Sequence, residues 1–129
     1  MAVCTWAVLC DYAFLDDHGK MCLIGIFDRI NTKGVPTTHA HASLVLRLRG
    51  EPGEDVRVRV EMIRPTGAPQ GRTEQNVKLS PAGDAGIQMS LASLPLPDFG
   101  RYAFTITLND EVRQTLEFQV VRPSTDAPH

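Results

Sequence analysis

The sequence has no surplus of positive charge. Its 129 residues contain 13 Lys and Arg against 15 Asp and Glu, which gives a formal net charge of -2 at pH 7. Proteins that bind nucleic acid generally neutralise phosphates with a cationic surplus, so we predict no nucleic-acid partner. With 43% hydrophobic and 22% charged residues, the chain is typical of one globular domain with one core.

The chain also lacks a long apolar run. The first ten residues are mostly apolar, but no Lys or Arg precedes them and Asp11 interrupts them. A secretory signal has a basic start, and a membrane-spanning helix needs about 20 apolar residues. We therefore predict a cytoplasmic protein that has no contact with a membrane.

Cysteine is too scarce for a disulfide framework. The chain has three, Cys4, Cys10 and Cys22, and an odd number favours a reducing compartment. If residues 16–19 form a turn, Cys22 faces Ala13 and Cys10 faces Gly25, so a 10–22 disulfide is out of register. We predict packing thiols rather than redox or metal-binding groups.

Known catalytic motifs are absent from the sequence. It contains no G-x-S-x-G, H-E-x-x-H, P-loop or C-x-x-C, and the paired carboxylates Asp16 and Asp17 suit a tight turn. We predict a protein that is not an enzyme and has no cofactor. Catalytic groups need only meet in space, so an enzyme remains the third hypothesis.

Alternation of apolar and polar residues is the dominant pattern. Between 38 and 49 the apolar residues take the even positions, and residues 55–62 resume the pattern after a turn at 50–54. Such alternation is typical of half-buried strands, and the two segments predict a β-hairpin. Further strands are expected over 76–80, 86–94, 101–108 and 112–120, with a turn at 109–111. The last of these strands is predicted to direct inward Val112, Leu116, Phe118 and Val120.

The first thirty residues differ, because segments 3–15 and 20–30 are apolar on both alternating faces. Such strands are covered on both sides by a second sheet, a loop or another subunit, which predicts a homodimer or protein partner through the N-terminal strands. The chain as a whole predicts an all-β fold: a single antiparallel β-sandwich of seven or eight strands, favoured over a barrel. We assign residues 1–122 to this domain and 123–129 to a flexible C-terminal tail.

A five-residue motif carries a resemblance to a known fold. Residues 98–102 read Asp-Phe-Gly-Arg-Tyr, which resembles the D-x-G-x-Y tyrosine corner of immunoglobulin-like β-sandwiches. The resemblance implies a structural corner of Asp98, Gly100 and Tyr102, with the tyrosine hydroxyl bonded to upstream backbone. Protein kinases hold magnesium with Asp-Phe-Gly, but the other kinase motifs are missing. Phe104 stands where many of these domains have cysteine.

The opening of the chain is similar to that of an uncharacterised bacterial family. Members begin with a Cys-Asp-Tyr segment, here residues 10–12, followed by Lys-x-x-Leu-x-Gly-x-Phe-Asp-x-Ile, here residues 20–30. This resemblance implies no activity.

Two histidines form the one metal candidate in the sequence. His39 and His41 share the solvent face of a predicted strand, a spacing that chelates a metal when a neighbour adds a third ligand. No carboxylate or cysteine with suitable spacing lies next to them. We therefore predict no metal site.

Four arginines form the candidate partner-binding site. Arg47, Arg49, Arg57 and Arg59 lie on the outer face of the predicted hairpin, with Arg47 opposite Arg57 or Arg59. The face is either solvated and balanced by nearby carboxylates or a patch for an acidic partner. We predict a non-enzymatic protein-binding or assembly module. The alternative is a small-ligand or anion receptor that uses this face or the end loops at 31–38 and 65–72.

Overall fold

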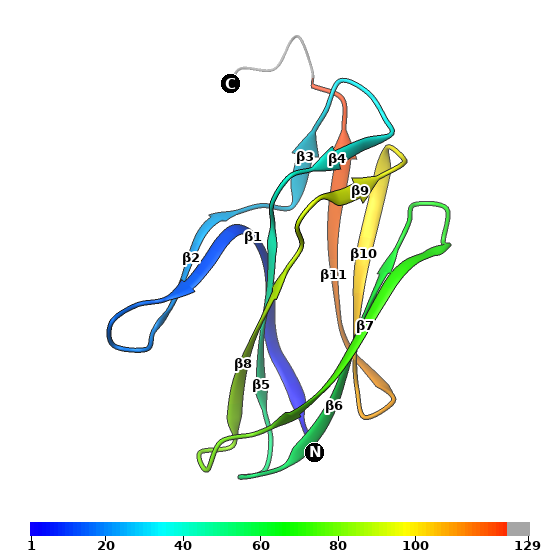
Figure 1. Ribbon diagram of the computed structural model, residues 1–129. Helices are drawn as coiled ribbons and strands as arrows, with labels where there is room; N and C mark the ends of the chain where they lie inside the picture. Colours follow the sequence, from blue (N-terminus) through cyan, green and yellow to red (C-terminus); the bar gives the residue numbers. More distant parts are fainter. Residues whose placement is uncertain (124–129) are drawn as a thin grey trace.

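The computed structural model describes residues 1–123, and this part of the chain is all β-structure without a helix, as predicted (Figure 1). The predicted flexible tail, 123–129, lies outside the described residues except for Pro123. None of residues 1–123 belongs to a helix long and apolar enough to cross a membrane. The strands are β1 (Val3–Leu15), β2 (Met21–Ile26), β3 (Arg29–Asn31), β4 (Thr37–His39), β5 (Ser43–Arg49), β6 (Asp55–Ile63), β7 (Pro69–Lys78), β8 (Asp84–Ser90), β9 (Leu94–Leu96), β10 (Gly100–Leu108) and β11 (Glu111–Val121).

Two larger sheets face each other. One has the strand order β2-β1-β5-β8, the other has the order β3-β11-β10-β6-β7, and β4 and β9 form a small third sheet. All neighbours are antiparallel except β3, which runs parallel to β11. The all-β class is thus confirmed, but there are more strands than the seven or eight predicted, one pair is parallel, and an immunoglobulin-like arrangement is not confirmed.

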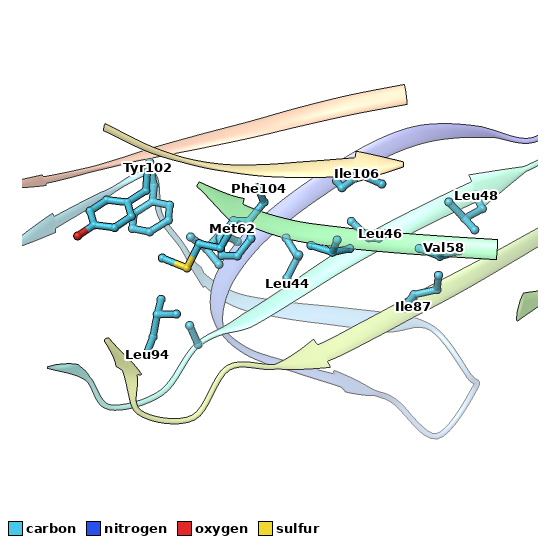
Figure 2. Packing of buried hydrophobic residues seen from close by; sticks show 14 of the residues in the cluster. Leu44, Leu46, Leu48, Val58, Met62, Ile87, Leu94, Tyr102, Phe104 and Ile106 are labelled. Atoms are coloured by element: carbon cyan, nitrogen blue, oxygen red, sulfur yellow. The ribbon is translucent and has the colours of Figure 1, made fainter. Parts of the chain in front are cut away.

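The core lies between the inner faces of these two sheets (Figure 2). Leu46 of β5, Val58 of β6 and Ile106 of β10 are fully buried, and the aromatic rings of Tyr102 and Phe118 stack with centroids 5.2 Å apart. Burying a side chain of this kind contributes roughly 1.5–3 kcal/mol to folding. The alternating inward positions predicted for these strands are therefore confirmed.

Val112 is the exception among the predicted inward residues, since it is 64% exposed. The β10–β11 pairing shifts register between Ile106 and Thr107, and Val112 then stands opposite Thr107. A shift of one residue moves a side chain to the other face of a sheet. The turn of this hairpin is as predicted: Asn109 and Asp110 have φ of 49° and 69°, values that two-residue hairpin turns favour.

The predicted hairpin of residues 38–49 and 55–62 is wrong. β5 pairs with β1 and β8, whereas β6 pairs with β7 and β10 in the other sheet. Residues 50–54 carry the chain from one sheet to the other. Alternation shows that each strand has one buried face, but it does not distinguish a hairpin partner from a partner across the core.

The tyrosine corner has the predicted hydrogen bonds. The buried Tyr102 hydroxyl donates to the backbone oxygen of Asp98 (3.0 Å) and accepts from the backbone N–H of the same residue (2.9 Å). Burial raises the pKa of this hydroxyl. Gly100 has a φ of +122°, and the Asp98 carboxylate binds Arg64 with Nη2 2.9 Å and Nε 3.0 Å away. In this corner the Asp98 carboxylate pairs with an arginine.

We expect Tyr102→Phe to lower the free energy of unfolding by about 1–2 kcal/mol, because it leaves both backbone groups of Asp98 without their partner. Urea denaturation followed by tryptophan fluorescence measures the loss. Tyr12→Phe is the matched control: Tyr12 is 55% exposed, so its stability should change by less than about 0.5 kcal/mol. Equal stabilities of Tyr102→Phe and the wild type would contradict a structural role for the corner.

Candidate functional site

The N-terminal hairpin projects from the body of the protein (Figure 1). β1 pairs with β5 from Val3 to Cys10 and then continues, from Cys10 to Leu15, paired with β2 alone. We call residues 11–26 the arm. Its tip is held by the Asp16 carboxylate, which accepts hydrogen bonds from the backbone N–H groups of His18 (2.9 Å) and Lys20 (2.8 Å). An acidic residue that bonds to backbone two residues on is typical of a tight turn, as predicted here.

One face of the arm packs back onto the protein. Leu15 and Met21 line a cavity together with Arg47, Gly86 and Gln88 on the outer face of β5 and β8. The Gln88 side chain donates a hydrogen bond to the backbone oxygen of Ala13 (2.7 Å). Cys10 of β1 and Val45 of β5 are also fully buried at this end of the sheet. Both lie on the face of the sheet that points away from the core. The predicted cover on the second face of the N-terminal strands is thus supplied in part by the chain itself.

The opposite face of the arm is apolar and exposed. Tyr12 stands opposite Ile24 and Phe14 opposite Cys22 across the β1–β2 ladder, so these four side chains share one face. Tyr12, Phe14 and Ile24 are all exposed, and so are Leu15 and Ile26 elsewhere on the arm. Side chains of this kind are usually buried in a monomer, and several together mark an interaction site.

The arm also ends in an unpaired strand edge, since β2 is the outermost strand of its sheet. Its sequence, Met-Cys-Leu-Ile-Gly-Ile, contains no charge and no proline, the two features with which proteins commonly block edge-to-edge pairing. β7, the edge of the other sheet, has Pro69, Arg72, Glu74 and Lys78. Of these two edges, β2 is the one that has neither of these blocking features.

Both candidate histidines lie at the base of the arm, but not on one strand as predicted. His39 ends β4, and His41 lies in the break before β5. The Nδ1 atom of His41 is 2.8 Å from the backbone oxygen of Asp11, and its ring lies 4.8 Å from that of Tyr12. His39 Nε2 is 3.9 Å from the Asp11 carboxylate. Residues 1–123 contain no cluster of three or more His, Cys, Asp or Glu side chains that could hold a metal ion.

Asp11 is the neighbouring carboxylate that the sequence did not reveal. It approaches His39 where the arm bends at Gly25, whose φ is +73° and where any side chain would collide with the Asp11 carboxylate. A glycine inside an apolar strand was the one sequence signal for this close approach. The two histidines therefore connect the base of the arm, at Asp11, to the end of β4 and the segment between β4 and β5.

The structure does not bring the four candidate arginines together. Arg47 and Arg49 lie on the outer face of β5 and Arg57 and Arg59 on the outer face of β6, in different sheets. The predicted opposition of Arg47 to Arg57 or Arg59 is therefore wrong. Arg47 binds the Asp84 carboxylate (2.8 Å), and Arg57 binds Glu74 (3.4 Å) and Asp110. Within residues 1–123, neither Arg49 nor Arg59 forms an ion pair with a carboxylate.

The three cysteines are free thiols, as predicted. The register differs by one residue from the predicted one, so Cys22 stands opposite Phe14 and Cys10 opposite Ile26. Burial raises the pKa of the Cys4 and Cys10 thiols. A raised pKa makes a thiol less reactive at neutral pH.

The predicted end-loop site corresponds to an open cavity of about 530 Å³. Its walls include Thr37, Thr38, Arg64, Pro69 and Gln70. Thr37 and Thr38 belong to β4 and Pro69 and Gln70 to β7, so these parts of the predicted loops 31–38 and 65–72 are strands. Arg64 is already held by Asp98, so the cavity offers hydroxyl and amide groups beside apolar prolines.

Comparisons with known proteins place residues 5–121 in the sequence model described as "Family of unknown function (DUF6941)". No curated protein matches the chain. Among solved structures, a Pseudomonas fluorescens alkylpurine DNA glycosylase bound to DNA is 14% identical with a TM-score of 0.51, over 72% of this chain and 27% of that one. A Listeria innocua β-glucosidase is 9% identical with a TM-score of 0.50, over 73% of this chain and 15% of that one. These likenesses concern the fold alone.

We expect iodoacetamide to label Cys22 well before Cys10 in the native protein, because Cys22 is partly exposed whereas Cys10 is fully buried where the arm leaves the sheet. Burial also raises the pKa of the Cys10 thiol, which lowers its thiolate fraction. Peptide mapping by mass spectrometry gives the order. Denatured protein, in which all three thiols should react at similar rates, is the control, and early labelling of native Cys10 would contradict this packing of the arm.

Proposed function

We propose that this chain, which belongs to the DUF6941 family, is a non-enzymatic assembly module that joins a second copy of itself through the arm. One observation carries the proposal: an exposed apolar face, containing Tyr12, Phe14 and Ile24, lies beside the uncharged edge strand β2. The four candidate arginines give the proposal less support, because two of them lie on one sheet and two on the other.

The exposed apolar face of the arm has the size of an interaction site. Tyr12 (55%), Phe14 (46%) and Ile24 (53%) share it, and Ile26 (66%) follows Ile24 on β2. With about 200 Å² for each full side chain, these residues expose roughly 440 Å². The largest apolar patch on a monomer is commonly of this size and is often functional.

A second copy suits this surface better than a charged partner does. β2 has no charged residue, so two β2 edges can approach around a two-fold axis without repulsion between like charges. Antiparallel pairing of the two edges would satisfy their free backbone groups. The same pairing would place Ile24 and Ile26 of one copy beside the β2 strand of the other and join the apolar faces of the two arms.

The finer assignments of fold and compartment are also part of this proposal. The Tyr102 corner and the two facing sheets support an immunoglobulin-like sandwich. The three free thiols support a cytoplasmic location.

We expect Ile24→Lys to convert a dimer into a monomer, because it places a charge in the centre of the apolar face and on the β2 edge. Light scattering should give twice the chain mass of 14.2 kDa for the wild type and a single chain mass for the variant. Far-UV circular dichroism should be the same for both, since the side chain is exposed in the monomer.

The matched control is Val112→Lys, which changes an equally exposed apolar residue on β11, away from the arm. This variant should remain a dimer. A wild type that stays at 14.2 kDa at millimolar concentration would end the self-association proposal, and a dimer that Ile24→Lys leaves intact would exclude the arm.

A receptor for a small ligand is the second candidate function. The 530 Å³ cavity beside Thr37, Thr38 and Gln70 supports it, because its volume falls in the range of ligand sites and its position matches the end loops. A fragment screen by NMR tests this candidate. Ligands of this site should shift the amide signals of Thr37 and Thr38, and Thr38→Trp should abolish the shifts, whereas shifts confined to the arm would contradict a receptor at these loops.

A further inference from the structure

A groove separates the two sheets along one side of the molecule. Its walls are β7 of one sheet and β8 of the other, each an outermost strand with a free backbone edge. The groove has a volume of about 540 Å³. Its floor is formed by the core side chains Leu44, Val60, Met62, Leu94 and Phe104; all of these except Val60 are labelled in Figure 2.

The two walls of the groove do not pair with each other. Within residues 1–123, β7 pairs with β6 alone and β8 with β5 alone, so each has one row of backbone N–H and C=O groups without a strand partner. Each wall therefore keeps a free edge to which a strand can be added.

The inward face of β7 is uncharged. Gly71, Thr73 and Gln75 stand opposite Met62, Val60 and Val58 of β6, whose side chains face the core, so they share the inward face. Arg72 and Glu74 alternate with them: Glu74 pairs with Arg57 on the outer face, and Arg72 borders the groove. A charge inserted into this groove would lose its hydration without gaining a partner, so an occupant must direct uncharged side chains toward the floor.

We propose that the groove between β7 and β8 binds an extended segment of a partner protein as an added β-strand. The groove-lining part of β7 runs from Gln70 to Gln75, about 20 Å of extended chain, which sets the length of the segment at about six residues. Backbone hydrogen bonds to the free edges hold it, and alternate apolar side chains enter the floor. A small apolar molecule would leave these edges unpaired. This site lies at the opposite edge of the sheet from the arm and does not depend on the proposed dimer.

A random nonapeptide library displayed on phage, selected on the immobilised protein, tests the proposal. Enriched peptides should alternate apolar residues with a period of two and lack proline at the centre. A synthetic copy of the strongest peptide should slow hydrogen exchange at amides of β7 and β8. Ile24→Lys should bind it as the wild type does, which keeps this test separate from that of the arm.

Gly71→Phe is the blocking variant, because a side chain there points toward the floor and its Cβ meets no atom within 4 Å. It should weaken peptide binding at least tenfold. Asn76→Phe is the matched control: Asn76 stands opposite Arg57 on the outward face of the same strand, and binding should be unchanged. Thr73→Lys, which puts a charge in the groove, serves as a second blocking variant should Gly71→Phe fail to fold.

Several results would overturn the proposal. These are enriched peptides without alternation, exchange protection confined to the arm, and binding that neither Gly71→Phe nor Thr73→Lys weakens. A selection that enriches no peptide, while the apolar dye anilinonaphthalene sulfonate binds and Gly71→Phe displaces it, would assign the groove to a small molecule instead.

Discussion

The dry layer between the two sheets is the constraint on which the rest of the structure depends. Leu46, Val58 and Ile106 meet there with almost no exposure to solvent, and each strand that contributes to it has one face committed to the core. Functional surfaces are therefore confined to outer faces, to strand edges and to the ends of the sheets. The arm, the groove and the end-loop cavity occupy these three kinds of place.

The arm forms because β1 extends beyond the part of the sheet that covers the core. This strand of 13 residues leaves β5 after Cys10 and continues with β2 as its sole partner. Beyond that point no second sheet is available to cover it, so one face packs onto β5 and β8 while Tyr12 and Phe14 remain in solvent. An apolar face that the fold leaves uncovered costs solubility, and proteins usually retain such a face where another chain covers it.

The sequence predicted local features better than it predicted partners. Alternation located β5, β6, β8, β10 and β11 with their buried faces, but it missed β9 and most of β7, whose first residues were predicted to be a loop. Asn109, Asp110 and the 98–102 motif located a turn and the tyrosine corner. The alternation could not show that β5 and β6 belong to different sheets. A strand with one apolar face can pair with its neighbour in a hairpin or face it across the core. Three further features depend on backbone geometry rather than on residue pattern. They are the bulge that exposes Val112, the one-residue register difference at Cys22 and the approach of Asp11 to His39. For the same reason the groove, which depends on the spacing of two edges, had no sequence signal.

The two proposed surfaces are compatible because they lie at opposite edges of one sheet. In the order β2-β1-β5-β8, the arm ends in β2 and the groove begins at β8. Pairing of two copies at β2 would give one continuous sheet of eight strands with a β8 edge, and hence a groove, at each end. Such a dimer could engage two segments of one extended or repetitive partner, and the second contact would then form at a high effective concentration. Weak strand addition at each groove would in this way suffice for stable binding, and the proposed dimer of the arms would raise the affinity of the proposed groove.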